Sequence, residues 1–270
     1  MKISRPVFRK ALIETHYIKG PYGDQLRRIR VLLPKDFDRR KKRRYPVVYL
    51  HDGQNLFFDG ESFSGRSWGL ISLQKKRSIP DLIFVGIDNL GEKRLDEYAP
   101  WKLDDESRGG WGDLYGQWLV DQVKPLIDRL YPTLSGPEHS LLAGSSLGGL
   151  ISAYIGTKYS HIFGSLGIFS LASWVSEGAF LDYVDKNPLA PTTRVYIMVG
   201  TQEGHEGEEL YSGQDLSRVY IKSSLNYYEF LLDQGQDPDR LCLRVINGGR
   251  HNEDFWARHF GEFLVHSFDE

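Results

Sequence analysis

LLAGSSLGG, residues 141–149, joins a short apolar run to a segment with helical periodicity. It contains the pattern G-x-S-x-G, which places a serine on a tight turn between a strand and a helix, with Ser146 at its centre. Glycines two residues on either side relieve the collision that larger side chains would make in such a turn. Ser145 fails this test, because Ala143 and Leu147 flank it. Ser146 is therefore the candidate nucleophile, at a helix N-terminus that favours negative charge.

Short apolar segments alternate with helix-length stretches on both sides of this turn. The later apolar segments are nearly continuous, which is typical of parallel strands covered on both faces. The first two segments lie too close together for a helical crossover, so we expect an antiparallel hairpin there. The pattern predicts an α/β fold with a sheet of about eight strands, mostly parallel and flanked by helices. The predicted strands are 12–17, 26–33, 47–50, 82–87, 140–143, 165–169, 195–199 and 241–246, and the predicted helices are 114–130, 147–158, 216–234 and 252–268.

The composition of the chain argues against nucleic-acid-binding and membrane proteins. The 270 residues include 34 Lys plus Arg and 36 Asp plus Glu, for a net charge of −2, so we expect no nucleic-acid partner. No apolar run reaches membrane-spanning length and no signal peptide is visible at the start, so we expect no membrane partner. A single cysteine, Cys242, suits a reducing compartment. We therefore predict a single cytoplasmic domain over residues 1–270; the sequence carries no signal for oligomeric state.

Two later segments supply a base and an acid for the serine. A serine hydroxyl needs an adjacent base that an acid orients. In proteins with this elbow, the acid precedes the histidine along the chain. His251 follows the last predicted strand in a turn that opens a helix, and Glu203 lies just past the preceding strand, with Glu206 further along the same loop. We predict His251 as the base and Glu203 as the acid, with Glu206 or a Ser–His dyad as open alternatives.

The loop after the third predicted strand reads HDGQNLF over residues 51–57. Acyl transfer needs donors aimed at the oxygen that becomes negative. One donor is expected to be the backbone N–H of Leu147, the residue after the nucleophile. Gly53 lets the backbone turn closely past the site, so we predict the N–H of Gln54 as the second donor. This chemistry requires no metal and no organic cofactor, and we predict none.

Several segments along the chain match one family together, in the same order. They are 47–57, 85–89, Arg94 with Glu97-Tyr98, 144–149, and 248–252 with Trp256. They resemble the putative-esterase branch of the α/β-hydrolases, which includes esterase D-like S-formylglutathione hydrolases, enterochelin esterases, feruloyl and acetyl-xylan esterases and mycolyltransferases. The resemblance implies the α/β-hydrolase fold. It also puts Ser146, Glu203 and His251 in the triad positions, and Gln54 and Leu147 in the oxyanion positions.

The expected pocket follows from the loops at the same edge of the sheet. Many α/β-hydrolases insert a cap domain between the sixth and seventh strands, but residues 170–193 allow only a short excursion. We therefore predict no large cap domain and an open cleft. Trp68 and Trp174 fall on loops expected at this edge, where flat apolar rings suit an aromatic or sugar-bearing ester. We predict that they line the substrate pocket together with Asn55.

These features favour a serine hydrolase that cleaves carboxylic esters through an acyl-enzyme and takes a small-molecule ester as its partner. Short acyl esters, feruloyl or acetyl groups on carbohydrate, S-formylglutathione and siderophore-type esters all remain open as substrates. The first alternative is an acyltransferase that passes the same acyl-enzyme to an alcohol or sugar. The second is a non-catalytic binding protein on this scaffold, which an intact elbow, histidine and acid argue against.

Overall fold

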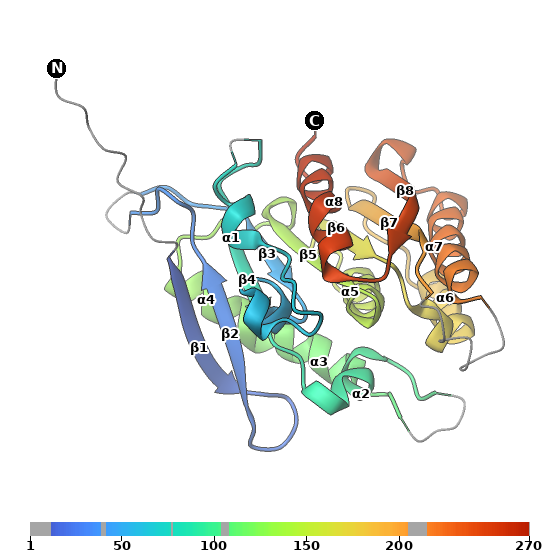
Figure 1. The fold of residues 1–270 in the computed structure, drawn as a ribbon, viewed down its shortest axis with the longest axis horizontal. Helices are drawn as coiled ribbons and strands as arrows, with labels where there is room; N and C mark the ends of the chain where they lie inside the picture. Colours follow the sequence, from blue (N-terminus) through green and yellow to red (C-terminus); the bar gives the residue numbers. More distant parts are fainter. Residues whose placement is uncertain (1–11, 39–41, 77, 104–107, 205–214, 270) are drawn as a thin grey trace.

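One eight-stranded sheet organises the residues that the computed structural model describes, which are 12–38, 42–76, 78–103, 108–204 and 215–269. Its strands are β1 (Ile13–Lys19), β2 (Leu26–Leu32), β3 (Val47–Leu50), β4 (Ile83–Ile87), β5 (Ser140–Ser145), β6 (Ser165–Phe169), β7 (Arg194–Gln202) and β8 (Leu241–Arg250). They lie in the order β1-β2-β4-β3-β5-β6-β7-β8 (Figure 1). The β1–β2 and β2–β4 pairs are antiparallel and the other pairs are parallel. The predicted mostly parallel sheet with an opening hairpin is confirmed.

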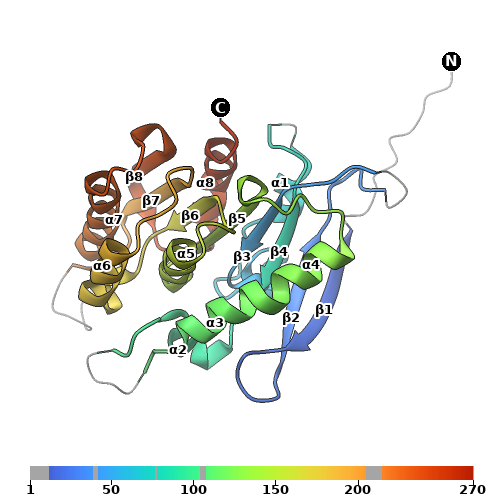
Figure 2. The same ribbon diagram turned by 180° about the vertical axis from the view of Figure 1, so that it is seen from behind.

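Side chains alternate between the two faces of the sheet, and each face has its own helices. On β3, Val47 and Tyr49 enter one apolar cluster, whereas Val48 and Leu50 enter the other. The helices α3, α4, α5, α6 and α7 cover the first face, and α1 and α8 cover the second (Figure 2). Their bounds are α1 (Leu70–Leu73), α2 (Arg94–Tyr98), α3 (Gly112–Trp118), α4 (Lys124–Leu130), α5 (Leu147–Lys158), α6 (Glu177–Lys186), α7 (Leu216–Asp233) and α8 (Glu253–His266).

The single helix predicted over residues 114–130 is divided in the structure. A π-helical segment, Leu119–Val123, separates α3 from α4, and Pro125 stands in the first turn of α4. Proline has no N–H to donate, so the regular hydrogen-bond ladder is interrupted there and a wider turn forms. The helices α1, α2 and α6 were not predicted; α1 and α2, with four and five residues, are too brief to show a periodic pattern. No helix within the described ranges combines the length and apolar character that a bilayer crossing requires.

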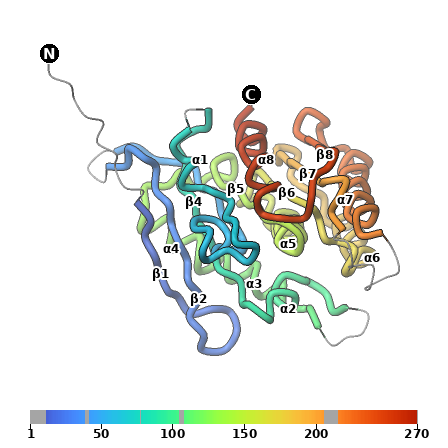
Figure 3. The backbone as a smooth tube through the Cα atoms, viewed as in Figure 1, coloured from blue at the N-terminus to red at the C-terminus, as the bar shows by residue number. Residues whose placement is uncertain are grey.

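The order of the strands places the functional loops. After β3 the chain moves outward to β4, then crosses back to form β5 on the other side of β3, as the tube in Figure 3 follows. The loops after β3 and β5 therefore diverge at the carboxyl edge of the sheet, where such reversals leave a crevice. The segment between β6 and β7 holds only a 3₁₀ turn, Ser173–Val175, and α6. The expected absence of a large cap domain is confirmed at this position.

Candidate active site

Ser146 sits on the turn between β5 and α5 in a conformation that few serines adopt. Its backbone angles are φ 60° and ψ −124°, and strain of this kind collects at functional sites. A Cβ on Gly144 would lie 2.5 Å from the carbonyl oxygen of Gly148. A Cβ on Gly148 would instead lie 3.2 Å from a carboxylate oxygen of Asp52. The two glycines thus permit different close contacts. Gly144 lets the first turn of α5 lie close to the end of β5, and Gly148 lets the loop after β3 approach the turn that holds Ser146.

Replacing Gly144 with alanine is expected to destabilise the fold by about 2 kcal/mol, because the new methyl group meets backbone that cannot rotate away. Urea unfolding followed by circular dichroism measures the change. Gly178→Ala in α6 is the matched control, since a Cβ there meets nothing within 4 Å, and a small gain from helix propensity is expected. Equal midpoints for Gly144→Ala and the wild type would contradict the steric account of the elbow.

His251 and Glu203 are brought together at the carboxyl edge of the sheet. His251 directly follows β8, and its Nδ1 lies 2.7 Å from Oε2 of Glu203, which directly follows β7. The Glu203 side chain is buried, and its other oxygen, Oε1, accepts hydrogen bonds from the Gly200 N–H (2.6 Å) and the Ser170 hydroxyl (2.7 Å). The carboxylate is thus held from both sides. It can accept the Nδ1 proton of His251 and leave Nε2 as the basic nitrogen.

Two aromatic rings and one serine surround this pair. Trp256, on α8, donates its indole N–H to the Ser170 hydroxyl at 2.8 Å, and its ring meets His251 edge-on at 4.9 Å. Tyr220, on α7, lies over His251 with ring centroids 4.5 Å apart. Sequence reasoning assigned no role to Ser170 or Tyr220. The position of Ser170 directly after β6 is a signal that could have found it, whereas Tyr220 lies within a regular helix and carries no such signal.

The loop after β3 is tied to the turn that holds Ser146 by a partly buried ion pair. Arg94 Nε and Nη2 each donate to Asp52 at 2.8 Å, and Nη2 also reaches the backbone oxygen of Ser145 at 3.3 Å. Asn89 donates its side-chain N–H to Asp52 at 2.7 Å. Burial opposes charge on Asp52, but the Arg94 guanidinium and the Asn89 amide outweigh it and hold the pKa of the carboxyl below its ordinary value of 3.8.

The backbone around the predicted oxyanion donors is also ordered by local contacts. Gln54 lies in a 3₁₀ turn, Gly53–Asn55, and its side-chain oxygen accepts the N–H of Asn89 at 3.2 Å. Leu147 is the first residue of α5, whereas the helical bonds to the Ser146 carbonyl begin with later N–H groups. The Leu147 N–H is one of the donors that a helix start leaves for a ligand.

Comparison with known proteins identifies the family of the chain. Residues 22–261 match the family described as "Putative esterase". The chain belongs to this esterase family. As a member, it is a carboxylic ester hydrolase, and the predictions of family and enzyme class are confirmed. Among curated relatives, the esterase is 31% identical over 222 residues to the uncharacterized protein YbbA of Bacillus subtilis, covering 80% of this chain and 82% of that one.

Two solved structures share the fold of this esterase. A ferulic acid esterase superposes with a TM-score of 0.71 at 17% identity, over 96% of this chain and 100% of that chain. The enterobactin esterase FES of Shigella flexneri superposes with a TM-score of 0.70 at 16% identity, over 96% of this chain and 60% of that chain. At these identities the likeness is one of fold, and the predicted α/β-hydrolase architecture is confirmed.

The residues predicted for the substrate pocket of the esterase differ in burial and in their neighbours. Trp68 is 5% exposed and packs among Phe169, Trp256 and Phe260 beneath α8, so little of its ring is left for a ligand. We leave it out of the proposed pocket and assign it to the core, because its neighbours in sequence fold back onto the sheet. Trp174 is half-buried and meets Tyr220 edge-on, beside the site.

Asn55, the third predicted pocket residue, braces two segments of the esterase. Its side-chain N–H donates to Glu253 at 3.1 Å, and its side-chain oxygen accepts the N–H of Phe63 at 3.0 Å. Because Glu253 begins α8 directly after the His251 turn, Asn55 links the loop after β3 to that turn. The alternative acid, Glu206, lies outside the described residues.

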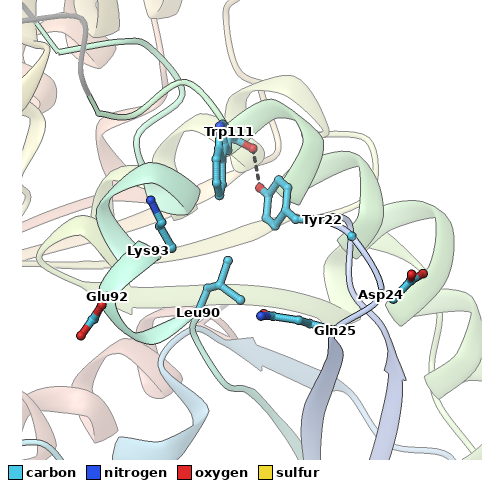
Figure 4. A pocket seen from close by; sticks show the side chains of 8 residues that line it. Tyr22, Asp24, Gln25, Leu90, Glu92, Lys93 and Trp111 are labelled. Atoms are coloured by element: carbon cyan, nitrogen blue, oxygen red, sulfur yellow. Dashed lines mark hydrogen bonds between the residues drawn. The ribbon is translucent and has the colours of Figure 1, made fainter.

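A cavity of about 620 Å³ lies between the β1–β2 turn and the segment that follows β4. It is lined by the β1–β2 turn, the residues before α2 and Trp111, whose backbone oxygen accepts the Tyr22 hydroxyl at 2.7 Å (Figure 4). Lys93 and Leu90 complete the wall (Figure 4). None of the predicted site residues lines this cavity.

Removing Arg94 is expected to leave Asp52 as an unpaired buried charge and to cost about 3 kcal/mol of stability at pH 7. Because the folded-state pKa of Asp52 is depressed, the pair stabilises the fold above the ordinary carboxyl pKa, and this contribution is lost as pH falls further. The deficit of Arg94→Met should therefore shrink in acid. Urea unfolding at pH 7 and pH 3 measures it. The control is Arg66→Met, a 73% exposed side chain expected to change stability by less than ~0.5 kcal/mol; equal deficits in the two variants would contradict the ion-pair role.

Proposed function

We propose that this esterase hydrolyses its substrates through an acyl-enzyme formed on Ser146, with His251 as general base and Glu203 as the acid that orients it. The observation that carries the proposal is the Glu203–His251 bond of 2.7 Å at the edge of the sheet where the strained Ser146 turn lies. Nucleophile, base and orienting acid are the three parts that serine-based acyl transfer requires.

The reaction runs in two halves. Nε2 of His251 takes the Ser146 proton as Oγ attacks the ester carbonyl, and the carbonyl electron pair moves onto oxygen. The backbone N–H groups of Gln54 and Leu147 hold that oxyanion. As the C–O bond to the alcohol breaks, His251 returns its proton to the leaving oxygen. Water then attacks the acyl-Ser146 ester by the same sequence and releases the carboxylic acid.

Glu203 contributes by its charge and by its fixed position. Its Oε2 accepts the Nδ1 proton of His251, which selects the tautomer with a free Nε2, and its charge stabilises the imidazolium that forms. The bonds from Gly200 and Ser170 to Oε1 prevent the carboxylate from turning away. The carboxylate remains an acceptor throughout, and the proton moves only between Ser146, His251 and the substrate.

For the substrate we propose a small ester with a short acyl group, or an aromatic or acetyl ester of a carbohydrate or siderophore. The short β6–β7 excursion supports an accessible site rather than a deep acyl tunnel. The half-buried Trp174 beside the site offers an aromatic surface to such a group. The fold shared with a ferulic acid esterase and an enterobactin esterase supports testing these two ester types first.

The test is hydrolysis of p-nitrophenyl esters from acetyl to octanoyl, combined with mass spectrometry of the enzyme quenched during turnover. We expect kcat/KM to fall as the acyl chain lengthens, and an added acyl mass on the peptide that contains Ser146. Repeating the assay with an added acceptor alcohol separates hydrolysis from acyl transfer: new ester would favour the transferase. Hydrolysis without acylation of Ser146 would overturn the proposal.

A further inference from the structure

Tyr220 contacts the proposed machinery from a helix that contributes no other residue to it. It lies in the second turn of α7 and is only 7% exposed. Its ring lies over the imidazole of His251, with centroids 4.5 Å apart and planes 36° apart. Trp174 meets the same tyrosine ring edge-on, with centroids 6.0 Å apart. Tyr220 also belongs to a small apolar cluster that Leu147 packs against. Tyr220 thus contacts His251 and belongs to a cluster that lies beside Leu147.

Burial raises the pKa of Tyr220 and is the largest effect on it, while the nearby Ser146 and Trp174 side chains act in the opposite direction. The phenol group therefore lies close to both of these side chains. The net direction is upward, so the phenol keeps its proton at neutral pH. A neutral phenol is a donor, and the Ser146 hydroxyl has two lone pairs to accept with.

The imidazole needs such support. His251 is held through Nδ1 by Glu203, a single bond about which the ring still has freedom to tilt. Tyr220 covers one face of the ring, and Trp256 closes another side edge-on at 4.9 Å. When His251 takes the proton from Ser146 it becomes a cation, and a cation over an aromatic face is attracted to it.

From these contacts we infer that Tyr220 is a positioning residue for the Ser146–His251 pair. Its ring fixes the plane of His251, and its hydroxyl donates to Ser146 so that the serine proton points toward Nε2. The inference rests on the proposed function, since it assigns Tyr220 a part in that same proton transfer. No bond to Tyr220 forms or breaks.

Two substitutions separate the ring from the hydroxyl. Tyr220→Phe keeps the ring and is expected to lower kcat for p-nitrophenyl acetate about tenfold with KM unchanged. Tyr220→Leu removes both and is expected to lower kcat about a hundredfold. The matched control is Tyr227→Phe, a buried tyrosine two turns along α7 whose hydroxyl contacts no site residue and whose ring packs on Phe180; its kcat should stay within about twofold of wild type.

A second readout reports the nucleophile itself. The rate of inactivation by diisopropyl fluorophosphate measures attack by Ser146 without a productive ester complex, and we expect it to fall in parallel with kcat in both Tyr220 variants. A merely structural role would lower folded fraction, measured by circular dichroism, and leave the rate per folded molecule unchanged.

The outcomes distinguish the two proposals. Wild-type kcat and inactivation rates in Tyr220→Phe and Tyr220→Leu, together with an inactive Ser146→Ala, would overturn the role of Tyr220 and leave the proposed function standing. Full activity in Ser146→Ala would overturn the proposed function and this inference with it. If Tyr220→Leu fails to fold, Tyr220→Phe alone decides, because unchanged rates in that variant exclude the hydroxyl's part in orienting Ser146.

Discussion

Ser146→Ala is expected to lower kcat/KM for p-nitrophenyl acetate by roughly 10⁴–10⁶-fold while leaving the urea midpoint within experimental error of wild type. Without Oγ no acyl-enzyme forms, so neither His251 nor the oxyanion donors have a reacting group to act on. What survives is the rate at which bound water attacks the ester beside the remaining donors. Steady-state hydrolysis measures the loss, at an enzyme concentration high enough for the rate of the variant to exceed the uncatalysed rate of ester hydrolysis.

The neighbouring serine is the control for this result. Ser145 is also buried and ends β5, but its side chain is flanked by Ala143 and Leu147 rather than by glycines. Ser145→Ala should keep kcat/KM within about threefold of wild type, since the Arg94 bond goes to its backbone oxygen and survives the change. Loss of activity in Ser145→Ala with retention in Ser146→Ala would move the nucleophile by one residue and refute the elbow assignment.

Glu203→Gln is expected to lower kcat by about 10³–10⁴-fold with little effect on KM or on folding. Glutamine has nearly the same shape, so the effect reports charge and proton placement rather than packing. Oε1 of Glu203 accepts the N–H of Gly200, and a glutamine must present its carbonyl oxygen there. Its NH₂ group then faces Nδ1 of His251, which must accept instead of donate. The imidazole proton moves to Nε2, the nitrogen that the serine needs as a base.

The same assay resolves which acid operates. Glu206→Gln is the matched control and should keep wild-type kcat, because we assign the bond to His251 to Glu203 alone. The reverse result, an active Glu203→Gln and a weak Glu206→Gln, would make Glu206 the acid. Wild-type activity in both variants would indicate a Ser–His dyad. Measuring kcat from pH 5 to 9 distinguishes a loss of kcat at every pH from a shift in the pH at which kcat is highest.

Local pattern predicts most of this fold because the sheet is built from continuous apolar runs. The strands predicted at 47–50 and 165–169 and the helix at 147–158 have the predicted bounds. The two strands are fully buried and the helix is buried along most of its length, so their sequences are strongly constrained. The predictions were wrong in two places. Pro125 divides a segment whose apolar pattern is continuous, and α6 forms because its apolar side packs on the first face of the sheet.

The site shows the same division. Elbow, histidine and acid follow strand ends, and a rule about strand ends is enough to predict their neighbourhood. The supporting contacts depend on side chains that meet across the fold: Ser170 with Trp256, Tyr220 with His251, and Asp52 with Arg94. No spacing along the chain encodes such pairs, because each depends on how a helix docks on the sheet. Trp68 illustrates the converse, since its loop position favoured a place in the substrate pocket, whereas its ring is only 5% exposed.

The strand order has a consequence for the heat tolerance of the enzyme. Ser146, Glu203 and His251 follow β5, β7 and β8, which all lie on the same side of β3 in the sheet, whereas Gln54 follows β3 itself. Within the sheet these two groups meet along one short seam, the four-residue register from Val47–Ser140 to Leu50–Ala143. An opening of that seam would move the predicted oxyanion donor Gln54 away from Ser146 while the other strand pairs stayed together. We therefore expect kcat to fall on warming before the helices unfold. The β3–β5 pair, rather than the Tm of the whole fold, would then set the highest temperature at which the enzyme works.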